Sequence, residues 1–389
     1  MKIAIVSDYF LDYVGGAQSS IHEQTASLEE AGHEVFLIAH TRKNSAPVDL
    51  AVPPSFTIPG VQLAVSYNRA PLIGLLTDFF ETHQVDVVHL QTEFGLAHAA
   101  IAAARLQGIP VVHTVHTFYW QSAGLGPTVV APLMKLMLQR ATDCYFAVEP
   151  FTGRPSDDLL RTLTAETAKL VDVVISPSEH QGADLVAAGV QTPLVIIPNP
   201  IARSPRPAAL LGDDVVARFL WVARCEPEKR PLVFAEAALA ALERADFEVD
   251  FVGDGSQLDE LRKLTDGAPG IRVHGNLGHD EVLQLIDDSS VVVLTSNGFD
   301  NQPMTIAESV SRYRGVLFCD PKLREGLGNS GYLSADPSAA ALADAIVTLS
   351  TQPGALQALS RGALEDAVIF SAATYVERVM AAYALAGRA

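Results

Sequence analysis

The sequence has few cysteines and few cations. Its 389 residues include three cysteines, Cys144, Cys225 and Cys319, which lie far apart and form no CxxC pair. Neither a disulfide framework nor a structural zinc site is therefore indicated. The chain has 27 Lys and Arg residues against 45 Asp and Glu residues, which gives a formal net charge of −18. We do not expect nucleic acid as a main partner, because phosphate contacts need a cationic surface.

Long hydrophobic runs are also missing. No apolar run approaches the roughly 18 residues that a membrane span needs, and the alanine-rich residues 95–106 are interrupted by His98 and Arg105. Met1 and Lys2 lead directly into an expected strand at residues 3–6, which leaves no room for a cleaved signal peptide. We therefore expect a cytoplasmic protein, with at most peripheral contact with a membrane.

The composition and length predict two α/β domains. With 49% hydrophobic and 19% charged residues, the chain has the composition of a compact globular protein, and it is long for a single core. Short apolar segments alternate with helical patterns, which is typical of parallel sheets covered on both faces. Four prolines within residues 198–207 exclude a helix and a central strand there. We predict two doubly wound, Rossmann-like domains, residues 1–199 and 200–370, that face a deep cleft.

The periodicity locates the main elements of both halves. Strands are expected at residues 3–6, 35–39, 85–90, 111–114, 173–176 and 194–197, and then at 219–223, 249–252, 271–274, 291–294 and 316–319. Helices are expected at residues 17–31, 231–242, after Gly255, 280–288, around Glu308, and 375–386.

The strongest functional pattern lies between residues 291 and 308. Asp300 and Glu308 flank the start of a helix that follows the apolar strand 291–294. In an open parallel sheet, backbone N–H groups and the positive end of the helix dipole point out of the crevice at this position. A diphosphate is a natural ligand there. The alternative is that Asp300 only caps the helix and Glu308 is a solvated helix residue.

A second strand end supplies cations. Arg224 and Lys229 come just after the strand at residues 219–223. Arginine offers a planar fork and lysine a point charge, and together they suit a pyrophosphate. Each alone would be an ordinary surface charge, so the prediction rests on the two strand ends taken together.

Glycine turns follow two other strands. Gly15 and Gly16 join the first strand to the first helix, where backbone N–H groups can approach a phosphate or a sugar. The third glycine of a GxGxxG fingerprint is missing, so a dinucleotide-dependent dehydrogenase loses its main support. A plain tight turn is the alternative. Gly253 begins a similar turn, which we expect to be structural with a supporting ligand contact.

Histidines cluster near the ends of two strands in the first half. His89, His113 and His116 could indicate a metal, but strand alternation directs His113 and His116 to opposite faces and no HExxH motif is present. A histidine at a strand end is better placed to hydrogen-bond a sugar hydroxyl or a developing charge. Residues 133–140, rich in Met and Leu, are expected to be core rather than a lipid contact.

Together these motifs resemble the family-4 retaining glycosyltransferases of the two-domain GT-B fold. The resemblance rests on the Gly15-Gly16 turn, residues 114–117, 197–199, 253–255, the Arg224 and Lys229 pair, and the acidic pair Asp300 and Glu308 with seven residues between them. It covers nearly the whole chain. It implies a retaining enzyme that transfers a hexose from a UDP- or GDP-sugar to a hydroxyl acceptor and needs neither a metal nor another cofactor.

The resemblance also implies residue roles. The implied catalytic residues are His116, Arg224, Lys229 and Asp300, with the two cations on the diphosphate, Asp300 on the transferred sugar and His116 near the reacting centre. The implied donor-binding residues are Gly15, Gly16, Asn199, Gly253, Gly275, Asn301, Gln302, Pro303, Met304, Thr305 and Glu308, with Glu308 on the ribose. Fixed cations and helix-start N–H groups would stabilise the leaving charge in place of a metal.

Three positions depart from the family pattern. The usual first Glu is Asp300, the usual Gly-Phe-Gly is replaced by residues 301–303, and the usual small residues after Glu308 are Arg312-Tyr313-Arg314. The first two lie beside the sugar, so they leave the identity of the sugar open while the reaction class stands.

Residues 91–96 and 112–119 resemble the branch that glycosylates diacylglycerol and related envelope lipids. We therefore expect a lipid or saccharide acceptor, with Glu93 and Tyr119 on the acceptor side. In this family a C-terminal helix such as residues 375–386 crosses back to the first domain. Two alternatives stay open: a nucleotide-sugar epimerase or phosphorylase of the same fold, and a non-catalytic nucleotide-sugar-binding protein.

Overall fold

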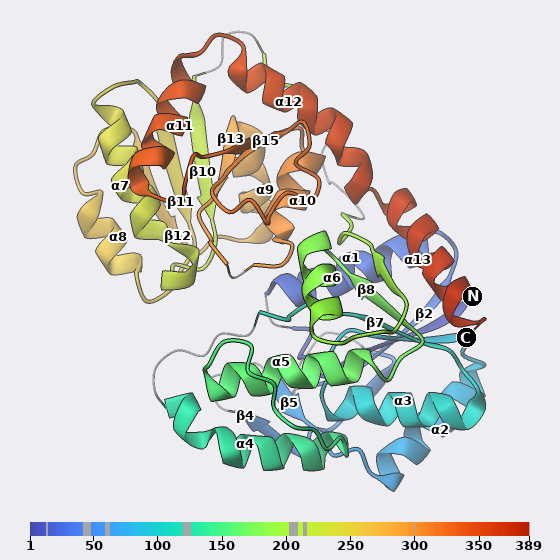
Figure 1. Cartoon of the computed structure of the whole chain (residues 1–389). Coiled ribbons are helices and arrows are strands. Elements are labelled where there is room, and N and C mark those ends of the chain that lie inside the picture. The colour runs from blue at the N-terminus through green and yellow to red at the C-terminus, as the bar shows by residue number, and fades with distance from the viewer. Residues whose placement is uncertain are drawn as a thin grey trace. The chain divides into compact units, whose positions relative to one another are not determined.

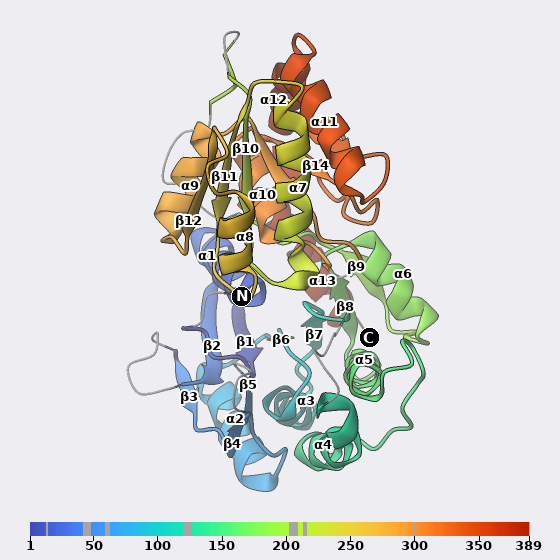
Figure 2. The same cartoon turned by 90° about the vertical axis from the view of Figure 1, so that its left-hand side faces the viewer.

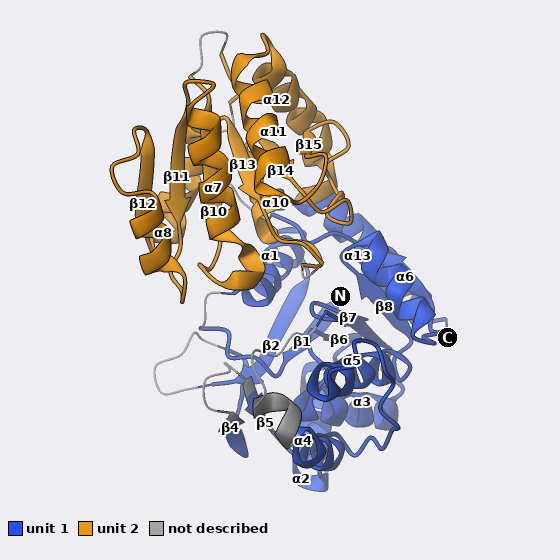
Figure 3. Ribbon diagram, turned by 60° about the vertical axis from the view of Figure 1, so that its left-hand side comes forward, with its two compact units in different colours: residues 1–202, 372–389 blue, residues 203–371 orange. Residues whose placement is uncertain are grey.

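The computed structural model describes residues 1–12, 15–41, 48–58, 63–119, 126–201, 209–212, 216–298 and 300–388. The chain divides into two compact units: unit 1 comprises Met1–Ala202 and Ala372–Ala389, and unit 2 comprises Arg203–Ser371 (Figure 3). Most of the proline-rich stretch at residues 198–207 lies outside the described residues.

Unit 1 is built on a seven-stranded parallel sheet (Figure 1). The strand order is β3-β2-β1-β6-β7-β8-β9, and Figure 2 labels each of these strands. Its strands are β1 Lys2–Ser7, β2 Glu34–His40, β3 Leu50–Val52, β6 Val87–Leu90, β7 Val111–Thr114, β8 Val173–Ser176 and β9 Leu194–Ile196. A separate antiparallel pair is formed by β4 Phe56–Ile58 and β5 Leu63–Val65. Its helices are α1 Gly16–Glu30, α2 Ala70–His83, α3 Gly95–Gln107, α4 Gly126–Thr142, α5 Pro155–Ala168, α6 Glu179–Ala187 and α13 Ala372–Ala386.

Both faces of the unit 1 sheet are buried. In β1, Ala4 and Val6 belong to a core that includes α3, whereas Ile3 and Ile5 belong to a second core that includes α1 and α13. Successive side chains of a strand point to opposite faces, so an uninterrupted apolar strand requires helices on both sides. The C-terminal helix α13 is therefore part of the structure of unit 1.

Unit 2 has a six-stranded parallel sheet in the order β12-β11-β10-β13-β14-β15. Its strands are β10 Arg218–Val222, β11 Glu248–Val252, β12 Ile271–Gly275, β13 Val291–Leu294, β14 Gly315–Phe318 and β15 Gly331–Leu333. The helices are η1 Pro227–Lys229, α7 Pro231–Leu242, α8 Leu258–Leu264, α9 His279–Asp288, α10 Met304–Ser311, α11 Ala339–Thr351, α12 Ala355–Asp366 and η2 Ala367–Phe370. Helices α7, α8 and α11 share one core with the sheet, and α9 packs on the opposite face (Figure 2).

The predicted fold class, doubly wound α/β, is confirmed in both units, and most predicted strands agree with the structure to within two residues. The helix after Gly255 begins only at Leu258, because Ser256 is held by Glu226 through its N–H and its hydroxyl. The three-residue strands β3, β4, β5 and β15 were not predicted, since so short a segment shows too little alternation. In the described part of the chain, no helix has the length and apolar content needed to cross a bilayer.

Candidate functional site in unit 2 and the polar network of unit 1

An ion pair joins two neighbouring strand ends of unit 2. Lys229 is the last residue of η1, after β10, and Asp300 follows β13, which pairs directly with β10. Lys229 Nζ lies 2.5 Å from Asp300 Oδ1, and the two side chains are only 16% and 12% exposed. The capping alternative for Asp300 is wrong, because Pro303 occupies the N-cap position of α10 and makes no side-chain cap. The structure thus brings together two of the residues predicted to meet the donor.

The second carboxylate oxygen of Asp300 is available. Asp300 Oδ2 is buried, and none of the residues that the structure describes donates a hydrogen bond to it. Leaving a buried acceptor unsatisfied costs about 1–3 kcal/mol, and more when the acceptor is charged. An oxygen in this state is suited to accept a hydrogen bond from a ligand hydroxyl.

Thr295 links the Lys229 and Asp300 strand ends. Its hydroxyl donates to the backbone carbonyl of Lys229 at 2.6 Å and accepts from the Trp221 indole N–H at 2.9 Å. The Arg230 guanidinium donates to the Thr295 carbonyl at 3.2 Å. Sequence reasoning missed Thr295, although its position directly after β13 was a usable signal. The small hydroxyl side chain of Thr295 fixes the position of the Lys229 backbone, from which the lysine side chain extends.

Asp320 shapes the loop that precedes Asp300. Its carboxylate accepts from the Gly298 N–H at 2.6 Å and from the Lys322 N–H at 2.9 Å. Gly298 has φ +70°, a left-handed conformation that favours glycine. Asp320 itself follows β14 and was not predicted to matter. Three adjacent strands, β10, β13 and β14, therefore contribute side chains that fix this site.

Glu308 lies inside α10 with 13% of its side chain exposed. The alternative that it is a solvated helix residue is therefore wrong. His279, the first residue of α9, places Nδ1 3.9 Å from Glu308 Oε1 and was not identified from the sequence. The remaining predicted contacts of this segment form the approach and first turn of α10, where Gln302 and Met304 are buried and the others are partly exposed: Asn301, Gln302, Pro303, Met304 and Thr305.

Arg224 stands apart from the Lys229 ion pair. Its side chain is 57% exposed and contacts Glu228 at 2.8 Å. Gly253 has φ +140°, and a Cβ there would lie 1.8 Å from the Ala223 carbonyl oxygen, so the approach of two strand ends requires glycine. The N–H of Gly253 donates to the Gly275 carbonyl at 2.8 Å. The two predicted glycines therefore hold β11 against β10 and β12.

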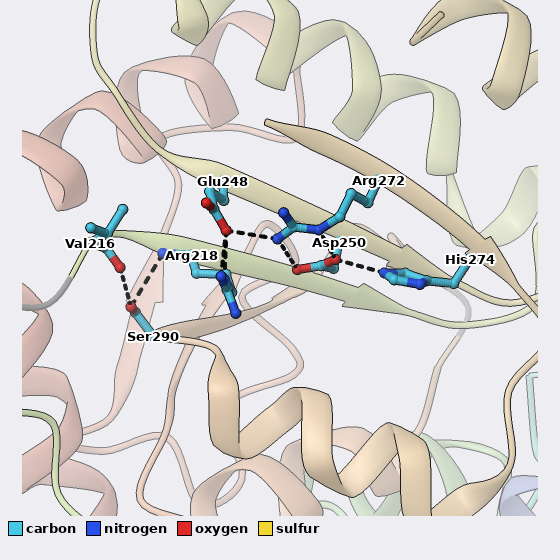
Figure 4. Close-up of polar contacts among 7 residues, drawn as sticks. All are labelled: Val216, Arg218, Glu248, Asp250, Arg272, His274 and Ser290. Atoms are coloured by element: carbon cyan, nitrogen blue, oxygen red, sulfur yellow. Dashed lines mark hydrogen bonds and ion pairs between the residues drawn. The ribbon is translucent and has the colours of Figure 1, made fainter. Parts of the chain in front are cut away.

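A ladder of ion pairs crosses β10, β11 and β12 (Figure 4). Arg218 and Arg272 both contact Glu248, at 2.5 and 2.7 Å, and Arg272 also contacts Asp250 at 2.8 Å. His274 Nε2 lies 2.6 Å from Asp250 Oδ1. Burial alone would raise the pKa of Asp250, but hydrogen bonds from Arg272 and His274 lower it.

The ladder stabilises a bulge next to Gly275. Phe251 pairs with Val273 and Val252 pairs with Gly275, so His274 is the extra residue of β12. The contact between His274 and Asp250 holds this residue against β11. The ladder therefore fixes the backbone that leads into Gly275, which has φ +77°.

In unit 1, His116 follows β7 and is half-buried. Its Nε2 lies 2.6 Å from Gln91 Oε1, and burial lowers the pKa of His116 to about 4. The imidazole is therefore neutral at neutral pH. His89 contacts the Tyr383 hydroxyl and the Thr114 hydroxyl, and both groups lie in the interior.

The two predicted glycines of unit 1 lie at the start of α1. Gly15 is the N-cap residue in extended conformation, and a Cβ on Gly16 would meet none of the described atoms within 4 Å. Internal packing therefore does not explain glycine at position 16. Asn199, after β9, is buried, and its Oδ1 accepts from the Ser20 hydroxyl at 2.6 Å and from Gln24 at 3.4 Å. It ties the end of the sheet to α1.

Glu93 and Tyr119, expected on the acceptor side, are both buried in unit 1. Tyr119 donates its hydroxyl to Asp184 at 2.7 Å and stacks on His180 with ring centroids 5.5 Å apart. Glu93 accepts from the Thr164 hydroxyl at 2.9 Å. These contacts give both side chains a packing role, and the acceptor role stays a prediction.

The bulky residues after Glu308 have a structural explanation. Arg312 is 2% exposed and donates two hydrogen bonds to the Asp287 carboxylate at the end of α9. Arg314 donates to the carbonyls of Asp287 and Arg312, at 2.6 and 2.9 Å. Tyr313, with φ +58°, makes the turn between them. This departure from the family pattern fastens α10 to α9 and leaves the Lys229 and Asp300 pair untouched.

Two family models match successive parts of the chain. The model of Glycosyltransferase Family 4 matches residues 14–204, and the model of Glycosyl transferases group 1 matches residues 217–352. An alpha-monoglucosyldiacylglycerol synthase of Streptococcus pneumoniae is 32% identical over 126 residues, which are 31% of this chain; the match spans only 27% of that synthase. A glycogen synthase of Mycobacterium tuberculosis is 26% identical over 93% of this chain and 89% of its own length.

Solved glycosyltransferase structures share the fold. Anabaena HepE, solved in complex with UDP-glucose, aligns over 98% of each chain with a TM-score of 0.65 and 16% identity. At that identity the likeness shows the fold alone, which is GT-B. By the two family models and this fold, the chain belongs to the family-4 glycosyltransferases.

Proposed function

We propose that this chain is a retaining glycosyltransferase that moves a hexose from a UDP- or GDP-sugar to a hydroxyl acceptor without a metal ion. The observation that carries the proposal is the Lys229 and Asp300 pair, with its buried, unsatisfied Asp300 Oδ2. The bond that breaks joins a sugar to a diphosphate. The Lys229 cation suits the diphosphate, and the open carboxylate oxygen of Asp300 suits a hydroxyl of the sugar.

Lys229 supports the diphosphate end. Sugar transfer breaks the bond from C1 to the diphosphate, so negative charge builds on the leaving group. A largely buried ammonium group stabilises that charge more strongly than an exposed one, because the local dielectric constant is lower. Arg224 is the exposed partner and supplies a second cation when its contact with Glu228 opens. These fixed charges take the role that a divalent metal has in other enzymes.

Asp300 supports the sugar end. Its Oδ1 is held by Lys229, which leaves Oδ2 to accept a hydroxyl hydrogen of the transferred sugar. Because aspartate is one methylene shorter than glutamate, the sugar hydroxyl has to come closer to the backbone of the loop. Glu308, partly buried in α10, is proposed to bind the ribose hydroxyls. In unit 1, Gly16 and His116 keep their expected roles as proposals.

Retention follows if the acceptor attacks from the face of the leaving group while a diphosphate oxygen takes its proton. This route needs no protein nucleophile, and it places the stabilising cation close to the atoms that react.

A lipid acceptor is the preferred choice. Helix α4 exposes Leu133 by 70% and Leu136 by 47%, while Leu138 is buried. The expectation that residues 133–140 are core rather than a lipid contact holds for Leu138 and for Met134 and Met137, which pack in the same core. It does not hold for Leu133 and Leu136, which lie one turn apart and face solvent. We propose that this pair inserts into a bilayer surface during peripheral contact. The name of the related alpha-monoglucosyldiacylglycerol synthase, which contains a diacylglycerol lipid, supports a lipid acceptor.

The donor proposal is tested by a thermal-shift screen of UDP-, GDP- and ADP-sugars, because a bound donor raises the melting temperature by mass action. Slow hydrolysis of the stabilising donor is expected, and Asp300→Asn should reduce hydrolysis while it preserves nucleotide binding. A freely released, epimerised sugar would favour the epimerase. Tight binding with neither hydrolysis nor transfer over a panel of acceptors would favour a non-catalytic binding protein.

The acceptor proposal is tested with vesicles that contain diacylglycerol. Leu133→Glu with Leu136→Glu should abolish vesicle binding and lower transfer to lipid, but not donor hydrolysis. Leu364→Glu is the matched control, since Leu364 is 43% exposed on α12 of unit 2. Vesicle binding that survives the double substitution would remove α4 as the membrane contact.

A further inference from the structure

A buried chain of hydrogen bonds connects His116 to the C-terminal helix. His116 Nε2 contacts Gln91 Oε1 at 2.6 Å, and Gln91 Nε2 donates to Gln24 Oε1 at 3.2 Å. The hydroxyl of Tyr375, in α13, donates to the same Gln24 oxygen at 2.9 Å. Gln24 and Gln91 are each 1% exposed and Tyr375 is 2% exposed. The chain brings together segments from four parts of the sequence, all in unit 1.

The direction of the hydrogen bonds is fixed at the far end. Gln24 Nε2 donates to the Ser20 hydroxyl at 2.8 Å and to Asn199 Oδ1 at 3.4 Å. Its Oε1 must then face Tyr375 and Gln91. Burial raises the pKa of Tyr375, so its hydroxyl keeps the proton and donates it. The amide of Gln91 is therefore oriented with its oxygen toward His116.

We propose that α13 acts through Gln24 and Gln91 to hold His116 as the Nε2–H tautomer, which makes Gln91 a positioning residue for the transfer reaction. Because His116 is neutral, one ring nitrogen carries the only proton and the other carries a lone pair. An acceptor oxygen opposite Nε2 assigns the proton to that nitrogen. Nδ1 is left as a hydrogen-bond acceptor.

This assignment restricts the group that His116 can recognise, and here it rests on the proposed function. An acceptor nitrogen binds a hydroxyl, which brings its own hydrogen, and it repels a carboxylate. The sugar group that meets His116 is therefore a hydroxyl, and a uronic acid at this position should be a poor donor. Discrimination of this kind is strong because a buried polar group loses its partner with the wrong substrate.

The tautomer is measured directly on the full-length protein. Nitrogen-15 NMR of histidine-labelled protein distinguishes a protonated from an unprotonated ring nitrogen, and the His116 signals are assigned by their loss in His116→Gln. We expect His116 in the wild type to be protonated on Nε2 only. A wild-type His116 protonated on Nδ1 would overturn the proposal, whatever the enzyme does.

Two substitutions test the chain of contacts. Gln91→Met keeps the size of the side chain but removes the acceptor, so we expect mixed tautomers and a kcat lower by about tenfold to a hundredfold, the scale on which misplaced groups act. The KM for the donor should stay the same. Tyr375→Phe removes a single hydroxyl and should produce a smaller change in the same two quantities.

Tyr383→Phe is the matched control. Tyr383 lies on the same helix and is also 2% exposed, but its hydroxyl contacts His89 and not Gln24. It should lower stability as Tyr375→Phe does and leave the His116 tautomer unchanged. The proposed control of His116 by the hydrogen-bond chain is wrong if Tyr383→Phe shifts the tautomer as much as Tyr375→Phe does. It is also wrong if Gln91→Met changes neither the tautomer nor kcat. If instead His116→Gln leaves kcat intact, the role of His116 in the proposed function fails while the tautomer result stands.

Discussion

The strand ends of the two units carry different kinds of polar chemistry. In unit 1, three side chains that follow β6, β7 and β9 are neutral, Gln91, His116 and Asn199, and their hydrogen bonds lead to α1 and, through Gln24, to α13. In unit 2 the ends of β10 and β13 hold charges, Lys229 and Asp300, which form a largely buried ion pair. Neutral groups with fixed donors and acceptors suit sugar hydroxyls, and charges suit a diphosphate. Two sheets of the same architecture thus specialise through the residues that follow their strands.

The largest expected difference between the two units is in their stability at acidic pH. Burial lowers the pKa of His89 and His113 to about 3 and of His98 and His116 to about 4, and all four belong to unit 1. Each folded pKa lies below the unfolded value of about 6.5. The unfolded state therefore binds more protons as the pH falls below about 6.5, and stability drops by up to about 1.4 kcal/mol per pH unit for each histidine.

Hydrogen exchange with mass spectrometry, corrected for intrinsic exchange rates, measures this unit by unit. Between pH 7 and pH 4.5, peptides of unit 1 should lose protection earlier than peptides of unit 2. The two histidines of unit 2, His274 and His279, are 29% and 61% exposed at the side chain and have no comparable burial. Equal loss of protection in both units would show that the buried histidines do not make the difference.

Removal of the Lys229 charge in unit 2 should give the next largest effect, a loss of donor turnover. Lys229→Ala leaves Asp300 unpaired and the leaving diphosphate without its buried cation. The transition-state stabilisation calculated from kcat/KM should therefore fall by about 2–4 kcal/mol. Steady-state donor hydrolysis gives the value. Arg244→Ala, which removes a half-exposed arginine paired with Asp344 in the same unit, is the charge-matched control. Wild-type kinetics in Lys229→Ala would refute the site.

Glu308→Gln tests whether Glu308 contributes to nucleotide binding and not to the rate of the chemical step. If Glu308 binds ribose hydroxyls in the ground state and the transition state alike, loss of its charge should weaken nucleotide binding by about 1.5–3 kcal/mol and leave kcat unchanged. Calorimetry with the free nucleotide measures the affinity. An unchanged affinity would move the ribose site away from α10.

Thr295→Val tests how the charges are held in place. It removes the hydroxyl between Trp221 and the Lys229 carbonyl, and we expect a loss of about 1 kcal/mol of stability together with weaker donor turnover. Thr295→Ser should restore both, because it keeps the hydroxyl. Urea unfolding and kinetics on the two variants decide this. If Thr295→Ser were as impaired as Thr295→Val, the hydroxyl contacts would not be what holds Lys229, because serine keeps the hydroxyl and valine keeps the methyl.

Sequence reasoning located the strand ends and the residues on them, because apolar periodicity and turn glycines are local signals. It did not identify Thr295 and Asp320, which contact Lys229 and Gly298 only once β10, β13 and β14 lie side by side. Tyr119 was expected on the acceptor side because residues 112–119 resemble the branch that glycosylates envelope lipids. Its hydroxyl partner, Asp184, lies 65 residues later, and no pattern in the sequence connects them.

By itself the sequence determined the class of the fold, the two strand ends that carry Lys229 and Asp300, and the family resemblance. Those features depend on residues close together in the chain. The tertiary structure decided which groups touch: Asp300 with Lys229 and not with the end of α10, and Tyr375 with Gln24 across 351 positions. Burial and hydrogen-bond partners exist only after the strands have paired. They set the ionisation of His116 and leave Asp300 Oδ2 open to a ligand.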